Sequence, residues 1–479
     1  MVYQGPSRGC VSCKRRRKKS CMRCLRANRG CGGYEDGALS AFRMYGSQDA
    51  DSTYVSTARK CSLPVLVALP GTTTPPSDTL PVEATQADSS LYALRAFFYD
   101  CCVISTNLNL SRGFLSGLEK MAYGLGMESD LVQACKAISL GSHSKVQQRP
   151  KEIQKAELIY QKLLGSLAKA IENPPMAKTA ELKLIAMLLG LYQIIMTSET
   201  DLGYHEFHAK GIAALMKIGN FPLNLLGSIR CSRIPHSSKT LRVPGIFCTP
   251  ALVGEGESLD DLLLNLNMLW TESEGLFDLK DISSLRIESI TLDRRFAKWQ
   301  DSRVAEFKPT AIGKVNQSQH EADVAAGYWS GNVDTYFDLY VAGVWNIFRS
   351  ARLLLILLIM NLSDTIGEHE NGTTLNNTAE SIAEEIFASV PYHLADNLQV
   401  FLSDLATSKH VIDPGRTLGG LLLMHPLYVV SKMPFLPESM RIYAQKCLLW
   451  TGTYMGIGQA TLLAKVGIAD SLDYLSTCR

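Results

Sequence analysis

The sequence contains no uninterrupted apolar stretch long enough to cross a membrane. Its longest apolar run, LLLILLIMNL from Leu353 to Leu362, is about half the length that a membrane-spanning helix needs. No apolar secretory signal precedes the cysteines and cations near the amino terminus. We therefore expect an intracellular protein without a membrane partner, whose thirteen cysteines do not form a disulfide framework.

Catalytic signatures are also missing. There is no GxSxG motif and no GxxxxGK[ST] loop. The GIG triplet from Gly456 to Gly458 lies within a helical pattern and does not follow a strand, which argues against a dinucleotide loop. HEFH, from His205 to His208, lacks the HExxH spacing and an evident third ligand. We therefore expect that the protein is not an enzyme.

Acidic residues are absent from the first 34 positions, which contain ten Lys and Arg residues. The formal net charge of +2 therefore leaves 2 − 10 = −8 on the remaining 445 residues. The cations form a short amino-terminal module, and a polyanion is the partner that such a module favours.

Five cysteines accompany these cations in CVSCKRRRKKSCMRCLRANRGC, Cys10 to Cys31. Two pairs stand three residues apart, a spacing that brings two sulfur atoms within reach of one metal ion. A redox CxxC is the competing interpretation, but no βαβ pattern accompanies it; an unstructured basic tail is the third. We predict metal ligation, and the candidate ligands are Cys10, Cys13, Cys21, Cys24 and Cys31.

The flanking sequences GPSRGCVSCKRRRKK and SCMRCLRANRGCGGY resemble the two halves of the fungal-type Zn(2)-Cys(6) binuclear cluster of transcription factors. In that family six cysteines hold two zinc ions, and the first and fourth thiolates bridge them. The resemblance implies a nuclear, zinc-dependent regulator of RNA polymerase II genes that binds double-stranded DNA at CGG-containing sites. The family often dimerises through a coiled coil after the cluster, so a homodimer is implied by resemblance alone, because residues 35–89 contain no sustained heptads.

The third cysteine of the family pattern is missing. The family places it after six intervening residues, and Ser20 occupies that position here. The resemblance then gives one zinc ion Cys10, Cys21, Cys24 and Cys31, and leaves the second ion with three thiolates, which a structural zinc site does not favour. Two explanations stay open: a short coding segment is absent from this sequence between Lys19 and Ser20, or the protein carries an incomplete cluster that holds one zinc ion or none.

The basic residues of the cluster are the candidate DNA contacts. Arginine suits bidentate contact with guanine, and both Lys and Arg neutralise phosphates. The resemblance assigns base contacts to Arg16 and Arg17. The full candidate set is Lys14, Arg15, Arg16, Arg17, Lys18, Lys19, Arg23 and Arg26, of which Lys14, Lys19, Arg23 and Arg26 are better suited to phosphates.

The rest of the chain divides by composition. We predict a zinc-cluster module over residues 8–34, a disordered linker rich in Ser, Thr, Asp and Pro over 35–89, and an all-α array of many helices over 90–479. Residues 219–262 show no defensible period. Helical patterns cover residues 150–173, 179–198, 336–362, 378–405 and 437–463. In 150–173 the expected apolar stripe is Ile153, Leu158, Ile159, Leu163, Leu164 and Leu167.

Three segments of this helical region resemble the regulatory domain that accompanies fungal zinc clusters, particularly in regulators of secondary-metabolite gene clusters. They are YHEFHAKGIAALMKIG (204–219), DTYFDLYVAGVWNIFRSARLLL (334–355) and the segment 425–464, whereas residues 230–258 match poorly. The sequence thus predicts a sequence-specific transcription regulator that works with transcription machinery or co-regulators. The alternative is an interaction protein whose defective cluster no longer binds DNA specifically. Most of the eight other cysteines are expected to be buried small hydrophobic residues.

Overall fold

The computed structural model describes residues 86–172, 179–197, 257–273, 278–316, 325–368, 372–405 and 412–465, with side chains from residue 90 onward. The chain divides into two units, Met1–Ala93 and Leu94–Arg479. The predicted module 8–34 and nearly all of the predicted linker lie outside the described residues. The first described helix, α4, begins at Gln86, so the last four residues assigned to a disordered linker are helical.

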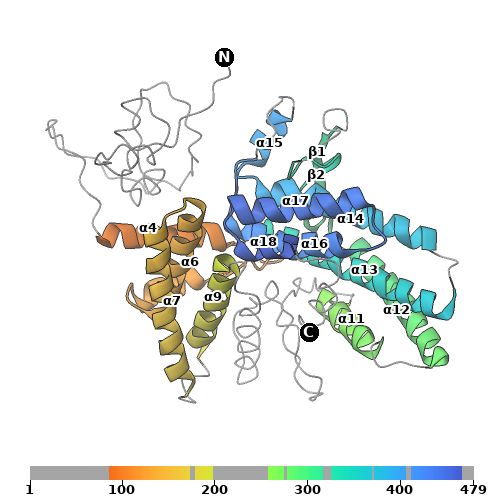
Figure 1. Cartoon of the computed structure of the whole chain (residues 1–479), viewed down its shortest axis with the longest axis horizontal. Helices are drawn as coiled ribbons and strands as arrows, with labels where there is room; N and C mark the ends of the chain where they lie inside the picture. The colour runs from red at the N-terminus through yellow and green to blue at the C-terminus, as the bar shows by residue number, and fades with distance from the viewer. Residues whose placement is uncertain are drawn as a thin grey trace, which may run out of the picture. The chain divides into compact units, whose positions relative to one another are not determined.

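The first part of the helical region is a group of helices (Figure 1). Its members are α4 (Gln86–Cys101), α5 (Leu118–Leu125), α6 (Asp130–Val146), α7 (Pro150–Ile171) and α9 (Ala180–Met196). Helix α6 packs against both α7 and α9. Pro150 begins α7, and the Thr179 hydroxyl accepts a hydrogen bond from the Leu182 amide at the start of α9. Both helices therefore start at residues whose chemistry favours a helix start.

The second part contains more helices and one hairpin (Figure 1). The helices are α11 (Leu259–Ser273), α12 (Leu279–Asp301), the short 3₁₀ helix η1 (Ala305–Phe307), α13 (Leu339–Ile366), α14 (Gly372–Leu394), α15 (Leu398–Asp404), α16 (Thr417–Lys432), α17 (Glu438–Tyr454) and α18 (Gly458–Lys465). Strands β1 (Thr310–Val315) and β2 (Gly331–Thr335) pair antiparallel, with an irregularity between Ala311 and Gly313. Helices dominate the described residues as predicted, but the hairpin is an exception to the all-α class.

Helix α13 forms the centre of this second part. It packs against α12, α14 and α16, and its fully buried side chains include Trp345, Phe348 and Arg349. By length and composition α13 is also able to cross a membrane, because it extends well beyond the apolar run at 353–362. However, 83% of its most apolar window is buried inside the protein. Core helices of soluble proteins have the same property, so α13 is weak evidence for a membrane span.

The predicted helices at 150–173, 179–198 and 336–362 correspond closely to α7, α9 and α13. Two others are wrong in extent because each is interrupted: 378–405 contains part of α14 and all of α15, and 437–463 contains all of α17 and part of α18. Gly456 and Ile457 lie in the second break, and Gly458 is the first residue of α18. Gly456 has a φ of +76°, and a side chain at Gly458 would collide with the carbonyl oxygen of Thr197.

The predicted apolar stripe of α7 is wrong at Leu158, which is 65% exposed. The fully buried residues of α7 are Ala156, Tyr160 and Leu163, the last of which belongs to the predicted stripe. Tyr160 stacks on Tyr192 of α9, with the ring centroids 4.5 Å apart. Ile159, Leu164 and Leu167 of the predicted stripe are partly buried and pack against the core. The prediction missed Ala156 and Tyr160, because it counted only the larger aliphatic residues.

Candidate nucleic-acid interface and a buried polar network

The predicted metal ligands and DNA contacts all belong to residues 10–31, outside the described residues. Their arrangement therefore stays a prediction, as does the zinc content. His205 and His208 also fall outside. The number of cysteines can be compared with the four ligands that a structural zinc site needs. Cys10, Cys21, Cys24 and Cys31 would supply four thiolates to one ion. Cys10, Cys13 and Cys21 would leave a second ion one ligand short.

Four of the eight remaining cysteines are described, and all four are buried as predicted: Cys101, Cys102, Cys135 and Cys447. Burial raises the pKa of each thiol, to about 12 for Cys102 and for Cys447. A buried thiol with a raised pKa is a poor nucleophile and metal ligand. Among the described residues no group of three His, Cys, Asp or Glu side chains is arranged to hold a metal ion.

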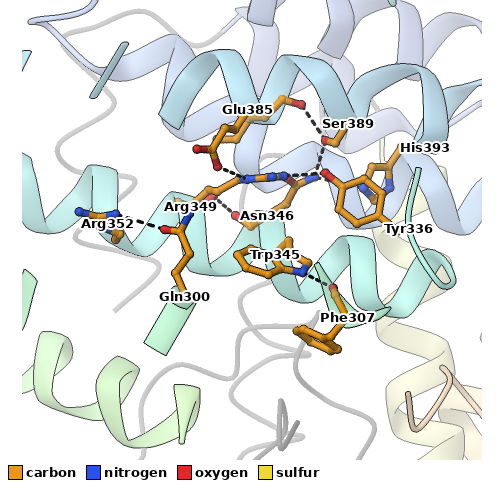
Figure 2. A network of polar contacts seen from close by, with 12 residues as sticks. Gln300, Phe307, Tyr336, Trp345, Asn346, Arg349, Arg352, Glu385, Ser389 and His393 are labelled. Carbon is orange, nitrogen blue, oxygen red and sulfur yellow. Dashed lines mark hydrogen bonds and ion pairs between the residues drawn. The ribbon is translucent and has the colours of Figure 1, made fainter. Parts of the chain in front are cut away.

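The most extensive polar cluster in the described residues surrounds Arg349 of α13 (Figure 2). We call it the buried polar network, and its members are Tyr336, Asn346, Arg349, Glu385, Ser389 and His393. Arg349 Nε donates to Glu385 Oε2 at 3.0 Å, while Nη1 donates to the Tyr336 hydroxyl at 2.8 Å and to Asn346 Oδ1 at 3.0 Å. The Arg349 side chain is 1% exposed and that of Glu385 is 37% exposed. The guanidinium therefore joins α13 to α14 and to the residue that follows β2.

Asn346 extends the network along α14. Its Nδ2 donates to Ser389 Oγ at 2.8 Å and lies 3.1 Å from His393 Nε2. Burial lowers the pKa of His393 to about 3, and Arg349 contributes to this, whereas a backbone hydrogen bond with Gly419 has the opposite effect. A neutral imidazole then accepts from Asn346 through Nε2. The Ser389 hydroxyl donates to the Ile386 carbonyl at 2.6 Å, so its proton is not directed at the imidazole, and the pair does not form a nucleophile and base.

Charge balance around Arg349 involves a second carboxyl group. Burial raises the pKa of Asp334 on β2, with Glu385 adding to the rise and Arg349 opposing it. Burial alone would lower the pKa of Arg349, but Tyr336, Glu385 and Asp334 outweigh that effect and raise it. The network thus keeps a charged guanidinium inside the fold. Its evident role is to fix β2 and α14 on α13.

Two cations bind the carbonyl groups at the ends of other helices: Arg416 connects the second group of helices to the first, and Lys145 connects two helices of the first group. Arg416, just before α16, donates to the carbonyl oxygens of Tyr99 and Cys102 at the end of α4. Its guanidinium also lies 5.4 Å from the ring centroid of Tyr99. Lys145 of α6 donates to the carbonyl oxygen of Ile195 at 2.8 Å and to that of Thr197 at 3.2 Å, at the end of α9. Cations suit these positions because the last carbonyls of a helix lack intrahelical donors.

The sequence analysis did not identify the polar residues around Arg349. Asp334, Tyr336, Asn346 and Arg349 itself nevertheless lie in the segment 334–355, which resembles the regulatory domain. An arginine inside an apolar helical stretch was the available signal. Its partners come from β2 and α14, and no local pattern specifies those contacts.

Comparison with known proteins adds one relative. The chain is 41% identical over 410 residues to the transcription factor dbaG of Emericella nidulans, and the match covers 84% of this chain and 98% of that protein. No protein-family model matches the chain. No solved structure matches it either.

Proposed function

Since this chain belongs to the same family as the fungal transcription factor dbaG, we propose that it is a sequence-specific, DNA-binding regulator of transcription. The observation that carries the proposal is the amino-terminal arrangement of five cysteines and nine basic residues without an acid, in a member of a transcription-factor family. Its place of action is the nucleus, its targets are RNA polymerase II genes, and control of a secondary-metabolite gene cluster is the role that the resemblance favours.

Zinc would supply rigidity to the basic module. Thiolates of Cys10, Cys21, Cys24 and Cys31 would hold the ion, and neighbouring cations favour the thiolate form of each ligand. Fixed on this base, Arg16 and Arg17 would read guanine edges in the major groove, while Lys14, Lys19, Arg23 and Arg26 contact phosphates. Arg15 and Lys18 add to the positive charge of the same surface. The helical domain would integrate a signal or contact co-regulators.

The test is DNA binding by a ligand variant with a matched control. Cys24→Ser removes one proposed zinc thiolate, and Cys101→Ser makes the same change at a buried cysteine of α4. We expect Cys24→Ser to lower the zinc content per chain and to abolish specific binding to CGG-containing DNA, while Cys101→Ser keeps both. Unchanged zinc content and DNA binding in Cys24→Ser would contradict the proposed site.

A second candidate function rests on Ser20, which stands where the family has its third cysteine. If the cluster is incomplete, the protein is a regulatory or interaction protein that acts through its helical domain without specific DNA binding. Zinc content and DNA binding together separate the two candidates. Two zinc ions per chain and strong preference for CGG-containing over random DNA support the first, whereas one ion or none with only salt-sensitive, non-specific binding supports the second. Sequencing the transcript across the codons for Lys19 and Ser20 decides whether a coding segment is missing.

A further inference from the structure

One face of α7 carries lysines along its whole length. Lys151, Lys155, Leu158, Lys162, Gly165 and Lys169 follow one another at intervals of three or four residues. At about 100° per residue, all six lie within about 40° of one direction. The four lysines and Leu158 are exposed. We call these six residues the lysine stripe, which extends about 27 Å along the helix.

The lysine stripe lies opposite the face that α7 buries. Ala156, Tyr160 and Leu163 form that buried face and pack into the core. The two acids within the helix do not lie on the stripe: Glu157 accepts from the Tyr192 hydroxyl of α9 at 3.1 Å, and Glu152 pairs with Lys155 at 3.1 Å. The cations therefore face solvent. They belong to residues 35–479, whose formal net charge is −8.

Two residues of the stripe have no explanation within the protein. Leu158 is 65% exposed, although it is flanked by lysines on a helix that has a separate apolar face. Gly165 lies inside the helix, where glycine is unfavourable. A Cβ atom at Gly165 would meet nothing within 4 Å, so no neighbouring atom requires the glycine there. Leu158 is among the most exposed of the large apolar side chains in the described residues.

A binding partner explains all three features together. Lysines at these intervals complement a row of carboxylates, the exposed Leu158 complements an apolar side chain, and the missing side chain at Gly165 lets a partner backbone approach closely. A DNA backbone would use the lysines but not Leu158. We propose that the lysine stripe is a docking surface for an acidic segment of another protein that carries an apolar side chain.

The experiment measures binding of the full chain to a fluorescein-labelled peptide of Asp and Glu residues with one central Phe, at an ionic strength of about 0.15 M. The stripe variant changes Lys151, Lys155, Lys162 and Lys169 to Gln. The control makes the same change at four exposed lysines elsewhere, Lys120, Lys280, Lys298 and Lys314. We expect the stripe variant to bind about tenfold more weakly and the control variant to bind like the parent chain.

Two single variants separate the stripe from general charge effects. Leu158→Gln should make the Phe-containing peptide and a Phe-free peptide bind alike. Gly165→Gln should raise the melting temperature, because glutamine favours a helix more than glycine does, and yet weaken peptide binding. A variant that is more stable but binds less well cannot be explained by misfolding.

Three results would overturn the proposal. The first is no binding of the acidic peptide by the parent chain under these conditions. The second is equal binding by the stripe and control variants. The third is tighter binding of random duplex DNA than of peptide, with loss of that DNA binding in the stripe variant, because it would assign the surface to nucleic acid.

Discussion

Replacement of Arg349 by methionine removes the guanidinium at the centre of the buried polar network while keeping most of the side-chain volume. Tyr336 and Asn346 then lose a charged donor that lies 2.8 Å and 3.0 Å away, respectively. A buried acceptor left without a partner costs about 1–3 kcal/mol. Glu385 is 37% exposed, and water rehydrates its carboxylate, so loss of this ion pair adds only about 0–1 kcal/mol.

Removal of the cation also eliminates the cost of keeping it dehydrated, which offsets part of this loss. We therefore expect Arg349→Met to lower the free energy of unfolding by about 3 kcal/mol. Arg294→Met is the matched control, because Arg294 lies on the exposed side of α12 and such a change usually costs less than about 0.5 kcal/mol. Urea unfolding followed by circular dichroism measures both. If the two variants unfold at the same urea concentration, the network does not stabilise the fold in the way argued.

Three further variants test other parts of the structure. His393 is neutral in the fold, where its pKa is about 3 against an ordinary value of 6.5. Its contribution to stability is therefore full above pH 6.5 and decreases as the pH falls toward 3. His393→Gln should reduce this loss of stability in acid unfolding curves, and an unchanged curve would contradict the argument. Arg416→Gln should speed hydrogen exchange at the end of α4 around Tyr99 without unfolding the domain, and parent-like protection there would mean that Arg416 is dispensable. Arg17→Ala should lower the binding free energy at a specific DNA site by about 1–3 kcal/mol and relax base preference. Arg23→Ala should weaken binding to specific and random DNA alike. If Arg17→Ala weakens binding to both DNAs equally, its assignment to a base contact is refuted.

Helices with strong local signals could be predicted from the sequence. Pro150 marks the start of α7, and Thr179 is the amino-terminal cap of α9. The buried face of α12 was also visible in principle, because Ile282, Leu285, Ser289, Leu292, Phe296 and Trp299 repeat at alternating intervals of three and four residues. The sequence analysis did not identify that repeat, in which Ser289 interrupts the apolar positions and aromatic residues replace aliphatic ones at the end.

The interruptions between helices depend on contacts that the sequence does not display locally. Gly456 adopts a positive φ between α17 and α18, and Gly458 packs closely on the carbonyl of Thr197, in a distant part of the chain. The hairpin of β1 and β2 is similarly stabilised from outside: Val333 is buried in a small core with Tyr328 and Phe401. Short strands with few alternating residues give little signal of their own.

Specific DNA recognition by the amino-terminal cluster is the central claim, and a competition experiment tests it most directly. Zinc-loaded full-length protein is bound to a CGG-containing duplex at physiological salt and displaced by the same duplex or by a random one. The account predicts that the specific duplex competes about a thousandfold better or more. Equal competition by the two duplexes, with binding that disappears as salt rises, would contradict it and leave a regulator that acts without specific DNA binding.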